Sequence, residues 1–138
     1  MNPYQTYQQQ QLTSATRIDL LLMLYDKAIG HLDQAHKALA QQNLLTATSR
    51  LLVAQAIVYA LATGVDLQYG EIPQNMLRLY EYVLHCLSCV EAKKIQDALR
   101  VLTILREGLT GIQPQARTKE WSGEIPSLTR SRALQFSA

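Results

Sequence analysis

The sequence predicts an all-α fold: an antiparallel up-down four-helix bundle with an extended N-terminal arm and a flexible C-terminal tail. Apolar residues recur at alternating three- and four-residue steps in four segments between residues 16 and 112, which is the period of one face of an α-helix. The connections between these segments are short, which favours antiparallel neighbours. We therefore expect one bundle domain over residues 1–112, including an arm over residues 1–15, and a tail over residues 113–138.

The first helix begins at a capping box. Thr16 and Asp19 have the spacing at which each side chain satisfies a backbone N–H group at the start of a helix. About six turns follow, whose apolar stripe consists of Ile18, Leu21, Leu22, Tyr25, Ala28, Ile29, Leu32, Ala35 and Leu39. Tyr25 lies on this stripe, so core packing is its expected role.

The second helix, over residues 44–63, is apolar on more than one face. Its core stripe is Leu44, Ala47, Leu51, Ala54, Val58, Leu61 and Val65, and a second set consists of Leu45, Leu52, Val53, Ala56, Tyr59 and Ala60. Gln55 is the one frankly polar residue in the run from Leu51 to Ala62. A run of twelve residues is too short to span a membrane. Gly64 is a natural residue to follow the end of the helix.

The third and fourth helices are expected after Pro73 and from about Lys94 to Thr110. The main stripe of the third helix is Met76, Leu77, Tyr80, Val83, Leu84, Leu87 and Val90, and its second stripe is Leu79, Tyr82, Cys86 and Cys89. The stripe of the fourth is Ile95, Ala98, Leu99, Leu102, Leu105 and Leu109, with Val101 and Ile104 beside it. Gly111 and Pro114 are expected to end the fourth helix.

Helices two and three have more apolar surface than a bundle of this kind needs for its core. Contiguous exposed apolar surface usually marks a binding site, and amphipathic helical segments are typical occupants of such surfaces. We therefore expect a partner to bind the second faces of these two helices and the arm. The predicted partner-binding residues are Tyr7, Leu52, Ala56, Tyr59, Ala60, Leu79, Tyr82 and Cys86.

Charge and motifs argue against several other functions. Residues 1–112 carry nine basic and nine acidic residues, whereas a nucleic-acid-binding face needs clustered cations. No secretory signal opens the chain. A Gly-rich phosphate loop, a nucleophile elbow and a Glu-x-x-His pair are all missing from the sequence. We expect no enzymatic activity, no cofactor, no nucleic-acid partner and no membrane insertion.

Two short motifs remain open to a functional interpretation. Cys86 and Cys89 form a C-x-x-C pair beside His85, but a zinc site needs further ligands, so we expect buried thiols and no metal. Arg78 and His85 lie two turns apart on one helix face. A ribonuclease-like bundle, with His85 as general acid/base and Arg78 on the phosphate, is therefore one alternative. A homodimeric adaptor bundle is the other.

Several segments together resemble the FliS family of flagellar secretion chaperones. They are Tyr7-Gln8, Leu12-Thr13, the run Leu22-Met23-Leu24-Tyr25-Asp26-Lys27-Ala28-Ile29, the run Gly70-Glu71-Ile72-Pro73-Gln74-Asn75 before Leu79-Tyr80-Glu81-Tyr82, and Leu102 with Leu105-Arg106-Glu107. The likeness covers about Tyr4 to Ile112. The chain departs from the family at Leu109, where an aromatic residue is usual, and in the segment after Gln113.

This resemblance implies a cytoplasmic type III export chaperone. FliS proteins bind the disordered C-terminal segment of flagellin, which becomes partly helical as it wraps the bundle, and they prevent its premature polymerisation. An N-terminal arm can cover the apolar groove until flagellin displaces it. The resemblance implies further partners, namely the anti-sigma factor of the flagellar regulon and a membrane protein of the export gate. We expect a monomer or weak homodimer.

Overall fold

The computed structural model describes residues 3, 15–65 and 70–124, which contain four helices and no strand. The helices are α2 (Arg17–Ala40), α3 (Leu44–Thr63), α4 (Glu71–Cys86) and α5 (Ala92–Trp121). The predicted all-α four-helix bundle is therefore confirmed. The described residues divide into two compact units: residues 25–106 belong to one, and residues 15–24 together with 107–124 belong to the other.

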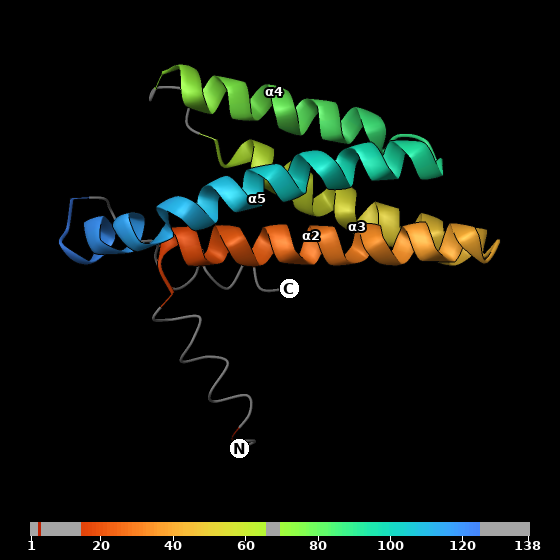
Figure 1. The fold of residues 1–138 in the computed structure, drawn as a ribbon, viewed down its shortest axis with the longest axis horizontal. Helices are drawn as coiled ribbons and strands as arrows, with labels where there is room; N and C mark the ends of the chain where they lie inside the picture. The colour runs from red at the N-terminus through yellow and green to blue at the C-terminus, as the bar shows by residue number, and fades with distance from the viewer. Residues whose placement is uncertain (1–2, 4–14, 66–69, 125–138) are drawn as a thin grey trace. The chain divides into compact units, whose positions relative to one another are not determined.

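All four helices contribute to the unit of residues 25–106, and successive helices run in opposite directions (Figure 1). Its core consists of one stripe from each helix, as the three- and four-residue spacing predicts. The buried residues are Tyr25, Ala28, Leu32, Ala35, Ala38, Ala47, Leu51, Ala54, Val58, Leu61, Tyr80, Val83, Cys86, Leu87, Ile95, Ala98 and Leu102. Full burial of each large aliphatic side chain contributes about 1.5–3 kcal/mol to folding.

Polar contacts fix the register of α2 against α3 and α5. Arg50 donates to Nδ1 of His31 at 3.2 Å, which joins α3 to α2. The amide of Gln96 lies 3.1 Å from Nε2 of His36, and Arg106 pairs with Asp26. The last two contacts are ten residues apart along both helices and in opposite order, so α2 and α5 are antiparallel in this unit.

The hydroxyl groups of Tyr25 and Tyr80 form a buried pair between α2 and α4. Their oxygen atoms are 2.6 Å apart, and the ring centroids are 6.3 Å apart at 51°. Burial raises the pKa of both hydroxyls above the ordinary value. The predicted core role of Tyr25 is confirmed, because its side chain is fully buried.

The single polar side chain in the apolar run of α3 has a structural role. Gln55 donates a hydrogen bond to the carbonyl oxygen of Leu87, the C-cap residue of α4. The hydroxyl of Ser88 donates to the carbonyl of His85 at 2.6 Å. Because these side chains satisfy carbonyl groups at the helix end, α4 ends at Cys86. The prediction that it continues to Val90 was wrong.

The start of α4 and the length of α3 also differ from expectation. α4 begins two residues before Pro73, after Gly70 with φ of 97°, a conformation that favours glycine. Pro73 still lies in the first turn, as predicted. With 20 residues, the whole of α3 is long and apolar enough to cross a membrane by length and composition alone. The same test is passed by the core helices of soluble proteins, and α3 has a buried stripe of that kind.

The second unit contains the start of α2 and the end of α5. The prediction that Gly111 and Pro114 end the last helix was wrong, because α5 continues to Trp121 with Pro114 inside it. Residues 113–121 are therefore helical and not part of a flexible tail; residues 125–138 lie outside the described residues. An internal proline costs about 3 kcal/mol. Side chains of the end of α5, namely Gln113, Arg117 and Glu120, contact the start of α2.

Candidate partner-binding surface

The second apolar set of α3 forms a row of exposed side chains. Leu45, Leu52 and Tyr59 are 84%, 60% and 64% exposed. They are seven residues apart and therefore lie along one face of the helix. Ala56 is exposed beside them. We call these four residues the outer strip of α3.

The outer strip has no charged or amide side chain. Arg50 is the only charged residue of α3, and it lies against His31. Gln55 is used at the end of α4. Burial, followed by the charges of Arg50 and Lys27, lowers the pKa of His31, which favours the neutral ring that accepts from Arg50. The charged and amide side chains of α3 thus make contacts with α2 and with the end of α4, and the four residues of the outer strip carry no charge.

The predicted residues of α4 form a second exposed apolar pair. Leu79 and Tyr82 are 37% and 46% exposed, and their three-residue spacing places them on one face. The side chain of Cys86, with a smaller effect of Asp97, raises the pKa of Tyr82, and the charge of Arg100 opposes the shift. Tyr82 therefore lies near α5. We call Leu79 and Tyr82 the α4 strip.

A model of the family "Flagellar protein FliS" matches residues 1–116. The chain belongs to the FliS family. FliS proteins are soluble flagellar export chaperones, and the family implies flagellin as a partner. The family is not known for enzymatic activity. None of the curated proteins compared with the chain matches it.

The sequence-predicted residues of this FliS chain differ in accessibility. Leu52, Ala56, Tyr59, Leu79 and Tyr82 are exposed. Ala60 is partly exposed, beside the outer strip. Tyr7 lies outside the described residues.

The placement of Cys86 on an exposed face was wrong. Its side chain is 1% exposed and belongs to the core, because it lies one turn after the buried Val83. Cys89, expected to be a buried thiol, is exposed in the connection after α4. The helix ends between the two cysteines, so they do not share one helical stripe.

Several exposed apolar residues of the FliS chain were not among the predicted binding residues, namely Leu44, Leu45, Val53, Ile72, Val90, Ile104, Ile112 and Trp121. Ile72 is 74% exposed in the first turn of α4, and Ile104 is 61% exposed on α5. The sequence contained a signal for Ile104, since it lies beside the core stripe and not on it. Ile72 precedes Pro73 at the helix start, where periodicity is too short to assign a face.

The alternative sites gain no support from the described part of the chain. Arg78 and His85 are both exposed on α4, and no hydrogen bond or ion pair involving either side chain is found among the described residues. Within the same ranges, no group of three His, Cys, Asp or Glu side chains has an arrangement that could hold a metal ion.

Proposed function

We propose that this FliS-family chain is a cytoplasmic export chaperone that binds the disordered C-terminal segment of flagellin and prevents its polymerisation before secretion. The client segment contacts the outer strip of α3 and the α4 strip. The observation that carries the proposal is the uncharged row of Leu45, Leu52, Ala56 and Tyr59 on the surface of the bundle. Exposed apolar surface of this kind typically binds amphipathic segments.

The apolar surface of the outer strip supplies part of the free energy needed to order and hold a client. Covering Leu45, Leu52 and Tyr59 contributes about 1.5–3 kcal/mol for each side chain. Ordering a disordered segment costs about 2–5 kcal/mol. The α4 strip then adds to a favourable balance, and occupancy follows the concentrations of chaperone and client. No nucleotide hydrolysis is needed.

We also propose for this chain the N-terminal arm, the further partners and the oligomeric state that the FliS family implies. The arm that contains Tyr7 covers apolar surface of the free chaperone, and flagellin displaces it. The anti-sigma factor of the flagellar regulon and a membrane protein of the export gate are further partners. The free chain is a monomer or a weak homodimer, which sedimentation of the isolated protein distinguishes.

The decisive experiment uses a peptide of about the last 40 residues of the organism's flagellin, titrated calorimetrically into the full chain. Ala56→Glu places an unpaired carboxylate in the middle of the outer strip, where burying it costs at least about 2 kcal/mol. We expect affinity to fall at least about thirtyfold while helicity by circular dichroism is unchanged. Gln34→Glu adds the same charge at an exposed position of α2 and should bind like the natural chain. Binding of Ala56→Glu within twofold of the control refutes the assignment of the outer strip.

A further inference from the structure

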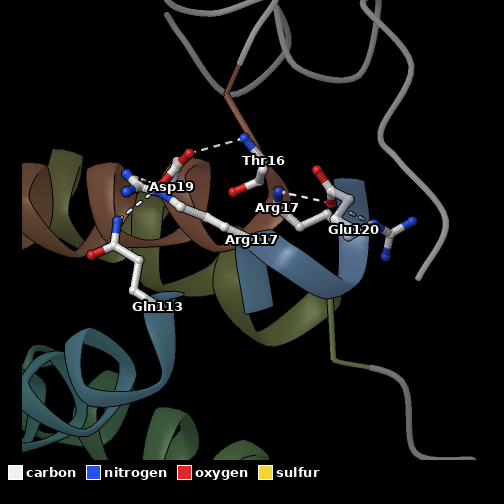
Figure 2. Close-up of polar contacts among 6 residues, drawn as sticks. All are labelled: Thr16, Arg17, Asp19, Gln113, Arg117 and Glu120. Atoms are coloured by element: carbon white, nitrogen blue, oxygen red, sulfur yellow. Dashed lines mark hydrogen bonds and ion pairs between the residues drawn. The ribbon is translucent and has the colours of Figure 1, made fainter. Parts of the chain in front are cut away.

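The two polar clusters where α2 begins both include residues from the end of α5 (Figure 2). Asp19 accepts hydrogen bonds from Gln113 at 2.8 Å and from Nε of Arg117 at 2.7 Å. A terminal nitrogen of Arg117 lies 2.6 Å from the same carboxylate oxygen. The other oxygen accepts from the backbone N–H of Thr16 at 3.1 Å.

Glu120 of α5 caps the first turn of α2. Its side chain is only 6% exposed, and it accepts the backbone N–H of Arg17 at 3.0 Å. Arg17 is the first residue of α2, where N–H groups have no partner within the helix. The guanidinium of Arg17 lies 4.0 Å from the same carboxylate. Glu120 thus caps α2 and places a negative charge at its positive end.

The local sequence supplies only half of the cap that it predicts. Asp19 accepts from the backbone of Thr16, but the buried hydroxyl of Thr16 has no hydrogen-bond partner among the described residues. The first turn of α2 therefore depends on Glu120, which is 103 residues away from Arg17 in the chain.

The end of α5 depends on α2 in return. Pro114 has no N–H group and cannot donate to the preceding turn, so α5 lacks one backbone hydrogen bond at this point. Gln113 and Arg117 are held by Asp19, and Glu120 is held by Arg17. Arg117 and Glu120 also lie beyond the segment that matches the family, which ends at residue 116.

We propose that Gln113, Arg117 and Glu120 act as a clasp that couples the helical order of the start of α2 to that of the end of α5. When the clasp is closed, the first turn of α2 and the last two turns of α5 are both helical. When it opens, both unwind together. Unwinding one turn of α2 lengthens that turn by about 7 Å, because a residue spans about 3.3 Å when extended and 1.5 Å in a helix.

Hydrogen exchange of the full chain tests this coupling in both directions. Glu120→Ala should speed exchange of the amides of residues 17–22 about tenfold, since a hydrogen bond to a charged group is lost. Asp19→Ala should speed exchange of residues 115–121 by a similar factor. Glu124→Ala removes an exposed carboxylate just after α5 and should change neither segment. The amides of Val58 and Val83, in the core of residues 25–106, correct for any global loss of stability.

Reciprocity separates a clasp from two independent helix ends. Coupling requires that each substitution affects the other helix, because a coupling free energy is the same from either side. If Asp19→Ala speeds exchange only within α2, or Glu120→Ala only within α5, the proposal is overturned. In the Asp19→Ala/Arg117→Ala double variant, we expect exchange no faster than in the more affected single variant. Effects that multiply would also overturn the clasp.

Discussion

The buried tyrosine pair allows a test in which two substitutions cost less than either one. Tyr25→Phe leaves the hydroxyl of Tyr80 in the core without the partner that it has at 2.6 Å. An unsatisfied buried hydroxyl costs about 1–3 kcal/mol. Tyr80→Phe should destabilise the chain by the same amount for the same reason. The Tyr25→Phe/Tyr80→Phe double variant retains both rings and removes both polar groups, so its stability should lie within about 0.5 kcal/mol of the natural chain.

Urea unfolding followed by circular dichroism measures these differences. With a slope of about 2 kcal/mol per molar urea, each single variant should lower the midpoint by about 0.5–1.5 M. Tyr59→Phe is the matched control, because Tyr59 is 64% exposed and loss of its hydroxyl should not move the midpoint. A double variant whose destabilisation equals the sum of the two singles would show that the hydroxyls do not act as a pair. Singles indistinguishable from Tyr59→Phe refute the hydrogen bond itself.

Two further perturbations follow from the polar contacts. Hydrogen bonds from Arg117, Gln113 and Thr16 outweigh burial, which by itself raises the pKa, and hold the pKa of Asp19 below its ordinary value. The stability that Asp19 contributes is therefore present above about pH 4 and is lost as pH falls through the lower folded-state pKa. In the Asp19→Asn variant, the free energy of unfolding should decrease less between neutral and acid pH than it does in the natural chain. An acid-unfolding curve by circular dichroism that is the same for both proteins contradicts this. Gln55→Met removes the hydrogen-bond donor to the carbonyl of Leu87 and should lower the free energy of unfolding in urea by about 1–2 kcal/mol. Gln34→Met, at an exposed position of α2, should leave it unchanged. If the two variants have equal urea midpoints, Gln55 does not stabilise the end of α4.

Local signals predicted the first two helices well. α3 begins after Asn43, whose side chain accepts the N–H of Thr46 at 3.2 Å, and it ends at Thr63 before Gly64. The apolar period then identified its buried stripe and left the second set for the surface. Periodicity was sufficient because both the helix ends and the faces of α3 are determined by residues close in sequence.

The errors occur where distant residues decide the local structure. Pro114 is an ordinary signal for a helix end, yet α5 continues because Gln113, Arg117 and Glu120 contact the start of α2. α4 ends early because Gln55 of α3 reaches its C-cap carbonyl. The sequence contains these residues but does not show which ones meet.

For the candidate surface, the sequence correctly predicted most of the exposed residues, but it did not show how the exposed residues of different helices are arranged. Leu52 and Tyr59 belong to the outer strip of α3, while Tyr82 lies near α5. A helical period shows which residues of one helix share a face, but it does not show which neighbouring helix that face meets.

The absence of charge from the outer strip of α3 affects how ionic strength acts on a bound segment. Screening by salt weakens attraction between exposed charges but leaves the burial of leucine and tyrosine side chains largely intact. If a segment binds against Leu45, Leu52 and Tyr59, its affinity should therefore change little with ionic strength, and a competing apolar segment should displace it more readily than salt does.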